Sequence, residues 1–167
     1  MLIALDTETG GLDATKNPIL SFALYAPGIT PFYAQVWGDP NLCDVKALQI
    51  NGLDPTAGRQ LADIILEFNN WHAEIGAPKF EVIGHNVGPF DMPFIKQLNL
   101  PCKFDYHYRD TLVAAALLKD SGKIQLEKLN LKACCEYFGI TYDAHNALED
   151  ARASYELWHK CLGIIKS

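Results

Sequence analysis

The order of strand-forming and helix-forming segments is the feature that most restricts the fold of this 167-residue chain. Three β-rich stretches come first, helical and extended stretches then alternate, and the last expected elements are helices. Strands are expected over residues 2–5, 18–25, 30–37, 81–84 and 103–107, and helices over residues 58–75, 91–98, 110–118, 125–138 and 146–163. This order predicts an α/β fold in which helices flank a mixed β-sheet.

The composition is that of a globular protein and excludes several functional classes. Apolar residues make up 49% of the chain, but no apolar run approaches the roughly 18 residues of a membrane span. The net charge of −6 argues against a protein that holds long duplexes by charge alone. It is compatible with an enzyme that holds a short nucleic-acid end through bound cations.

Residues 1–167 are expected to form a single domain, because the length suits one domain and no repeat or linker divides the sequence. The N-terminal apolar run has no basic segment and stops at Asp6, so we expect no signal peptide. Five cysteines without CxxC spacing argue against a disulfide framework or a zinc site, and Cys134 and Cys135 are expected to be buried thiols. These features favour a cytoplasmic protein without a membrane partner.

Two acidic residues follow the first apolar run directly. Residues i and i+2 of a strand point to the same face, so Asp6 and Glu8 are expected to project together. Carboxylates held that close repel each other unless a cation lies between them, and oxygen ligands favour Mg²⁺ or Mn²⁺. The alternative is a solvated strand end before the Gly10-Gly11 turn.

A second polar cluster follows the expected strand at residues 81–84. His85 and Asn86 enter a Gly/Pro-rich turn, and Asp91 then opens a helix. Taken alone, Asp91 is as well explained as a helix N-cap, and the other two as ordinary turn residues.

A third cluster lies at the start of the last expected helix. His145 precedes this helix and Asp150 lies about one and a half turns into it, so the imidazole can reach the face that carries the carboxylate. A neutral imidazole can take a proton from water. Both residues could instead be solvated, but the small residues Ala147, Ala151 and Ser154 indicate that this helix packs closely on a neighbour.

Taken together, the three clusters resemble, in order, the three motifs of the DEDDh exonucleases, a family that includes the proofreading subunit of bacterial DNA polymerase, ribonuclease T and oligoribonuclease. The matching segments are residues 6–12, 84–91 and 145–151. Asp110-Thr111 and the alanine-rich stretch after it are similar to a further family segment. A sister group has Tyr four residues before the last Asp, where this chain has Asn146, so His145 fits the subgroup with a histidine.

The resemblance implies a ribonuclease H-like fold and two-metal hydrolysis of phosphodiester bonds with Mg²⁺ or Mn²⁺. It implies that Asp6 bridges both ions, that Glu8 and Asp150 complete the water-activating site, and that Asp91 serves the second ion. His145 is then the general base. The implied substrate is the 3′ end of single-stranded nucleic acid, with DNA favoured, and the product is a 5′-mononucleotide.

The residues that touch the substrate are expected near the first and second motifs. Backbone groups around Thr9 and Gly10 can hold the terminal nucleotide, and Asn86 is a further candidate contact. Leu12 and Phe90 can stack on the last bases, although either can equally be a core residue. Two departures from the family pattern affect this region: Gly10 replaces a common Thr, and Asn51 replaces the usual His of a His-Gly-Ile turn.

Several alternatives stay open from the sequence. A basic stretch can follow the nucleic-acid strand or be a solvated helix face; its members are Lys119, Lys123, Lys128 and Lys132. An exoribonuclease of the oligoribonuclease or ribonuclease T type is the main rival, because no residue separates DNA from RNA. A non-catalytic polymerase-accessory module would be expected to lack one of the four acids or the histidine; these residues are Asp6, Glu8, Asp91, Asp150 and His145. A DNA polymerase partner stays possible, although only 17 residues follow Asp150, which favours a stand-alone enzyme.

Overall fold

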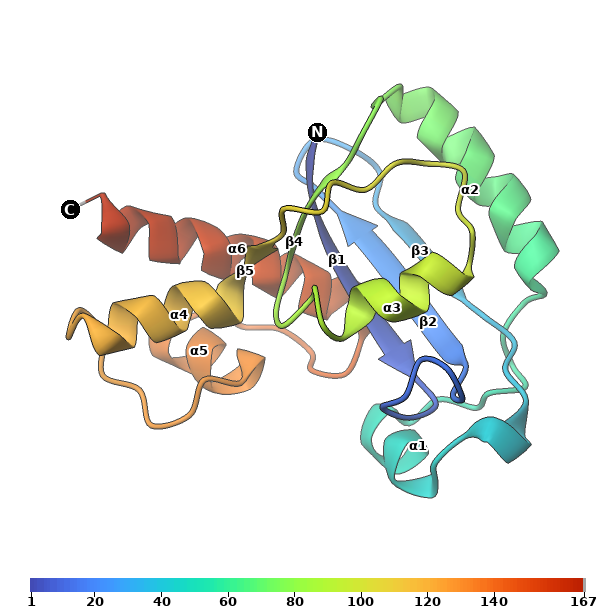
Figure 1. The fold of residues 1–167 in the computed structure, drawn as a ribbon, viewed down its shortest axis with the longest axis horizontal. Coiled ribbons are helices and arrows are strands. Elements are labelled where there is room, and N and C mark those ends of the chain that lie inside the picture. The colour runs from blue at the N-terminus through green and yellow to red at the C-terminus, as the bar shows by residue number, and fades with distance from the viewer. Residues whose placement is uncertain (167) are drawn as a thin grey trace.

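A computed structural model describes residues 1–166 and shows a five-stranded sheet with helices packed around it (Figure 1). The strands are β1 (Leu2–Thr9), β2 (Ile19–Tyr25), β3 (Phe32–Gln35), β4 (Glu81–Gly84) and β5 (Arg109–Asp110). Their order across the sheet is β3-β2-β1-β4-β5, so β1 is central. β1 pairs antiparallel with β2 and parallel with β4, which confirms the mixed sheet predicted from the sequence.

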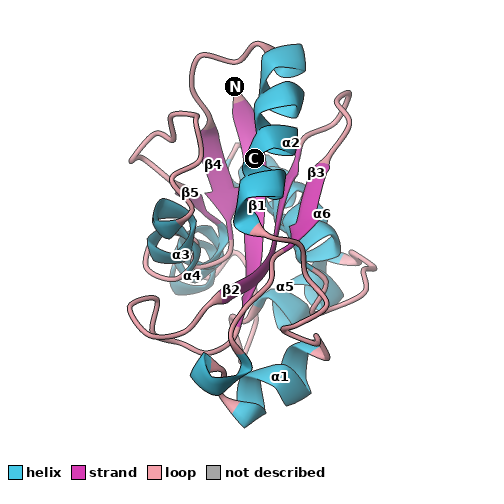
Figure 2. Cartoon of the chain, turned by 90° about the vertical axis from the view of Figure 1, so that its right-hand side faces the viewer, coloured by secondary structure: helices cyan, strands magenta, loops and turns pink. Residues whose placement is uncertain are grey.

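Six α-helices and one 3-10 turn connect and cover the strands. They are η1 (Pro40–Leu42), α1 (Val45–Asn51), α2 (Leu61–Ile75), α3 (Asp91–Gln97), α4 (Thr111–Asp120), α5 (Leu131–Phe138) and α6 (Ala147–Ile165). Figure 2 shows α1 at the end of the sheet toward which β1 runs. Among the helices of residues 1–166, none has the length and hydropathy to cross a membrane.

The alternation of side chains along β1 divides the core into two layers. Ile3 and Leu5 join a cluster with α2 and α3, which is rich in aromatic residues such as Phe68. Ala4 faces the other way and packs against α6 with Ala147 and Ala151. The small residues let α6 approach the sheet closely, as the sequence predicted, and α6 packs on β1, β2 and β4.

β1 does not stop at its apolar run. It continues to Thr9, because β2 pairs with it as far as Thr9 and Ile19, with an irregularity between Glu8 and Thr9. Asp6 and Glu8 therefore lie within a paired strand, and their common direction is set by the regular part of the ladder.

Other boundaries also differ from the expected ones. The strand expected over residues 103–107 lies instead at Arg109–Asp110. Within the expected stretch Phe104 forms an isolated parallel bridge with Phe80, and the chain then bends where the Asp105 carboxylate accepts a hydrogen bond from the His107 backbone amide at 2.9 Å. The helix expected over residues 125–138 begins at Leu131, since the Asn130 side chain caps it by accepting from the Ala133 amide.

Helix α1 was not expected, because the stretch around it is rich in turn residues. The helix ends at Asn51, and Gly52 closes it in the left-handed conformation at φ 66°. The cysteine prediction is confirmed: Cys134 and Cys135 are buried, unpaired thiols in the cluster between α4, α5 and α6.

Candidate active site

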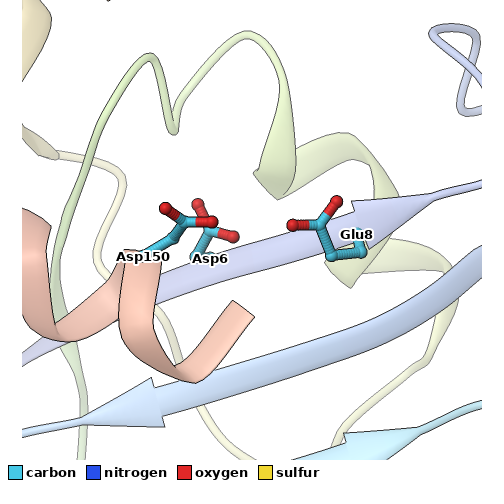
Figure 3. Close-up of side chains that lie close together, drawn as sticks. All are labelled: Asp6, Glu8 and Asp150. Carbon is cyan, nitrogen blue, oxygen red and sulfur yellow. The ribbon is translucent and has the colours of Figure 1, made fainter. Parts of the chain in front are cut away.

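Three carboxylates meet on the α6 face of β1. Asp6 and Glu8 project from the same face of the strand, and Asp150 reaches them from the first turns of α6 (Figure 3). Ligand oxygens of the three side chains all lie within 4.8 Å of one another. Residues separated by more than 140 positions thus form one group, as the strand and helix patterns predicted.

The start of α6 fixes Asp150 in this position. Asn146 caps the helix by accepting hydrogen bonds from the amides of Leu148 and Glu149. Asp150 Oδ2 accepts a hydrogen bond from the His145 amide at 3.0 Å, which ties the entry loop to the carboxylate. His145 has a positive φ of 68°, an uncommon conformation for a residue with a side chain.

Asp91 approaches from the opposite side of β1. It is the first residue of α3 and is buried, and its Oδ1 accepts a 2.7 Å hydrogen bond from the Thr7 hydroxyl. Phe90, not Asp91, occupies the N-cap position, so the capping explanation does not account for this carboxylate. Asp91 lines the same pocket as the other acids but is not one of the three that lie within 4.8 Å.

Burial and mutual repulsion make the ionised form of these acids unfavourable. Burial, followed by the charges of Asp91, Asp150 and Glu8, raises the pKa of Asp6 well above its ordinary value. Burial and then Asp150 raise the pKa of Glu8 to about 7, and burial above all raises the pKa of Asp150 to about 6. Burial likewise raises the pKa of Asp91 to about 8, although the hydrogen bond from Thr7 acts to lower it. A bound cation would reverse this preference.

The carboxylates line a cavity of about 360 Å³, here called the acid pocket. Six of the predicted site residues line it: Asp6, Glu8, Phe90, Asp91, His145 and Asp150. Three different segments of the sequence therefore meet around one space that can hold a phosphodiester group.

Sequence reasoning missed other residues of this pocket. His85, treated as a turn residue, lines it, and its Nδ1 lies 2.9 Å from the Thr111 hydroxyl. Lys132 and Tyr142 also line it, from α5 and from the loop before α6. A signal was available for His85, since it directly follows β4, the parallel neighbour of β1, and parallel strands end at the same edge of a sheet.

A smaller cavity of about 130 Å³ adjoins the acid pocket; we call it the terminal cavity. It lies between the end of β1 and α1, and its lining includes Thr9, Leu12 and Phe90, three residues that the sequence analysis named as candidate substrate contacts. Leu12 is 83% exposed, so it is not a core residue. Asn51, which replaces the family's histidine, lines the cavity and donates a 3.1 Å hydrogen bond to the Thr9 carbonyl.

Two predicted substrate contacts lie elsewhere. The Gly10 amide donates to the Pro18 carbonyl and its carbonyl accepts from the Asp44 amide, so both backbone groups are already bonded. A Cβ at Gly10 would lie 2.7 Å from Cys43 Sγ, so a larger residue would require the neighbouring side chains to shift.

Asn86 is the second residue that falls outside the lining of both cavities. Its φ is 63°, and its backbone N–H donates a hydrogen bond to Asp110 Oδ1 at 3.0 Å. Asn86 therefore shapes the turn after β4.

The lysine stretch does not form one surface along the site. Lys132 lines the acid pocket, whereas Lys119 and Lys123 donate to the carbonyls of Glu127 and Ile164. The loop over residues 121–130 separates them from Lys132, because α5 begins later than the sequence predicted.

No family model and no curated protein matches the chain by sequence. Solved structures do match it. Exonuclease I from Methylocaldum szegediense is 21% identical with a TM-score of 0.70, over 93% of this chain and 39% of that one. E. coli Exonuclease I with a dT13 oligonucleotide is 18% identical with a TM-score of 0.72, over 96% and 40%. Cell-death related nuclease 4 (CRN-4) is 15% identical with a TM-score of 0.72, over 98% and 64%.

This chain has the fold of these nucleases. The likeness confirms the ribonuclease H-like architecture expected from the sequence motifs. The chain spans about two fifths of Exonuclease I (39% and 40%) and 64% of CRN-4. The fold is therefore shared, and the reaction has to be argued from the site.

Proposed function

We propose that this protein is a metal-dependent 3′→5′ exonuclease that hydrolyses phosphodiester bonds at single-stranded ends. One observation carries the proposal: Asp6, Glu8 and Asp150 hold ligand oxygens within 4.8 Å of one another, in a chain with a nuclease fold. Buried and half-buried acids so close together serve little structural purpose, because each raises the cost of ionising the others.

The donor set fits divalent cations that prefer oxygen. Asp6, Glu8 and Asp150 offer carboxylate oxygens only, which favours Mg²⁺ or Mn²⁺ over zinc. Asp91 adds a fourth carboxylate from the other side of β1, where a second ion would be held. When bound, such ions lower the pKa of water and offset the charge on the phosphodiester oxygens.

His145 is the proposed general base. It lines the acid pocket, and the bond from its amide to Asp150 keeps the residue beside the carboxylates. The side chain is exposed to the pocket and not enclosed in the core, as a group that exchanges protons with solvent must be. It would accept the proton of the attacking water and so allow attack on phosphorus.

The terminal cavity is the proposed site of the 3′-terminal nucleoside. Leu12 and Phe90 supply apolar surface for a base, and Thr9 contributes to the wall beside the acids. Gly10 and Asn86 are proposed to shape this region through their backbone conformation and packing, without touching the nucleotide.

Single-stranded DNA is the favoured substrate, because E. coli Exonuclease I, which shares this fold, was solved with dT13 and dA16 oligonucleotides. RNA is the alternative. Association with a DNA polymerase and a cytoplasmic location stay predictions of the sequence; co-purification and cell fractionation test them.

Incubation of labelled single-stranded DNA and RNA with Mg²⁺, Mn²⁺ or chelator tests the proposal. We expect a ladder of DNA products shortened one nucleotide at a time with either metal, and intact substrate with chelator. Asp150→Asn provides the matched inactive control, since it keeps the shape of the side chain. Faster degradation of RNA would reverse the substrate preference but keep the reaction, whereas full activity in chelator would refute the mechanism.

A further inference from the structure

A second cavity adjoins the acid pocket on the side of α5. This cavity has a volume of about 430 Å³ and lies against α5 and the loop over residues 139–144; we call it the α5 groove. Lys132, Tyr142 and Ala144 line both the acid pocket and the α5 groove, so the two spaces share a wall.

The three cavities form a row with the acids in the middle. The terminal cavity shares Thr7, Glu8 and Phe90 with the acid pocket, but it shares no lining residue with the α5 groove. A linear ligand whose phosphate lies at Asp6 can therefore extend in two directions. One direction leads into the smaller terminal cavity, and the other leads into the α5 groove, which Lys132 flanks.

Lys132 is the one lysine or arginine among the residues that line the acid pocket, beside four carboxylates. Within residues 1–166 its ammonium makes no ion pair within 4.0 Å, although Glu136 lies one turn further along α5. By comparison, Arg152 on α6 pairs with both Glu149 and Glu156. An unpaired cation at the mouth of an acidic pocket suits an anionic ligand that enters there.

Tyr142 gives the same boundary a second kind of contact. Tyr142 is half-buried and lines both the pocket and the groove, and a tyrosine offers an aromatic ring and a hydroxyl that can donate a hydrogen bond. A cation next to an aromatic ring matches the alternation of phosphate and base along a nucleic-acid strand.

We propose that the α5 groove binds the nucleoside on the 5′ side of the scissile bond, and that Lys132 contacts the next phosphate, the second from the 3′ end. This inference rests on the proposed function, which places the 3′-terminal nucleoside in the terminal cavity. It makes Lys132 a positioning residue that recognises at least three nucleotides. A dinucleotide with a 5′-hydroxyl lacks the phosphate that Lys132 would contact.

Steady-state kinetics of Lys132→Ala on two substrates tests the proposal. With the 5′-hydroxyl dinucleotide of thymidine, which has one phosphate, KM should change much less than with the trinucleotide. With the trinucleotide, which has two, KM should rise roughly tenfold, the size of one charge-assisted contact, while kcat changes little. Lys132→Arg should restore most of the trinucleotide KM, because it keeps the charge.

The matched control is Lys128→Ala, which removes the same charge from an exposed lysine outside both cavity linings. Binding of a longer oligonucleotide in Ca²⁺ at several salt concentrations gives a second readout. For Lys132→Ala the slope of log K against log salt should fall by about 0.7, the value for one phosphate contact on a single strand, and for Lys128→Ala it should not change.

Two results would overturn the assignment. If Lys132→Ala raises the KM equally for the dinucleotide and the trinucleotide, Lys132 contacts the scissile phosphate instead. If Lys132→Ala and Lys128→Ala behave identically, Lys132 has no specific role in binding. Both results require a wild-type protein that degrades the trinucleotide. A wild-type protein that degrades neither substrate with Mg²⁺ or Mn²⁺ would instead refute the proposed function and the α5 groove proposal together.

Discussion

The hydroxyl of Thr7 donates a 2.7 Å hydrogen bond to Oδ1 of Asp91, and both side chains are buried. Thr7 lies between Asp6 and Glu8 on β1 but points to the opposite face, toward α3. One strand thus carries two acids on one face and, on the other, the residue that orients a third acid. This arrangement brings Asp91 into the acid pocket although α3 and α6 cover different faces of the sheet.

Thr7→Val should therefore reduce activity without removing any carboxylate. The substitution keeps the shape of the side chain but removes the hydroxyl that donates to Asp91 in a buried position. We expect roughly a tenfold loss of kcat/KM and a higher Mg²⁺ concentration at half-maximal rate, the usual scale for a buried acceptor that loses its partner. Thr7→Ser keeps the hydroxyl and should stay near wild type. An unchanged metal requirement in Thr7→Val would show that this bond does not position Asp91.

Without metal, the stability of the fold should depend on pH in the direction opposite to that of ordinary acid denaturation. Glu8, Asp150 and Asp91 have raised pKa values of about 7, 6 and 8, so the native chain keeps protons that the unfolded chain has released. The free energy of unfolding should fall as pH rises from about 5 to 8, because the native state binds more protons there.

Denaturant unfolding in chelator and in saturating Mg²⁺ measures this effect. Bound cations should flatten the decrease, since they stabilise the ionised carboxylates. Asp6→Asn removes one charge from the cluster, so in chelator it should also reduce the fall of the unfolding free energy with rising pH. A stability that rises with pH over this interval in chelator would contradict the assigned pKa shifts.

Asp6→Ala should abolish turnover and leave the metal-free fold as stable as before or more stable. Asp6 is surrounded by three other acids that raise its pKa, so its loss relieves repulsion. Thermal unfolding in chelator should give a melting temperature equal to or above that of the wild type. The added stability that Mg²⁺ gives the wild type should be absent in the variant. A large fall in the melting temperature in chelator would identify Asp6 as a structural residue.

His145→Ala should separate catalysis from metal binding. Loss of a general base lowers the chemical step by roughly 10²–10⁴. Metal affinity should change little, because His145 is not among the three residues whose ligand atoms cluster. Asp150→Ala should weaken both. Single-turnover rates with a parallel metal titration distinguish the variants, and a His145→Ala protein with the full rate at neutral pH would exclude the histidine as base.

Much of the site could be predicted because acids that alternate along a strand or lie in the first turns of helices are local sequence features. Asp6 and Glu8 share a face by the period of a strand, and the small residues Ala147 and Ala151 indicated the close approach of α6 that brings Asp150 to them. The mixed sheet followed from the order of the segments in the same way.

What could not be predicted depends on contacts between distant segments. Lys132 and Tyr142 line the pocket from α5 and from the loop after it, and α5 starts at Leu131, where the Asn130 side chain caps the helix later than the apolar pattern suggested. The full backbone bonding of Gly10 depends on Pro18 and Asp44, which no spacing rule connects with it.

The direction and metal dependence of degradation test the central claim most directly. A 5′-labelled single-stranded DNA is incubated with Mg²⁺ in three forms: with a free 3′-hydroxyl, with a 3′-phosphate, and as a closed circle. The account predicts a ladder of steadily shorter labelled strands from the first, strong inhibition with the second, an intact circle, and no reaction of any form in chelator. Cleavage of the circle, or release of the 5′ label as a mononucleotide at the earliest times, would contradict it.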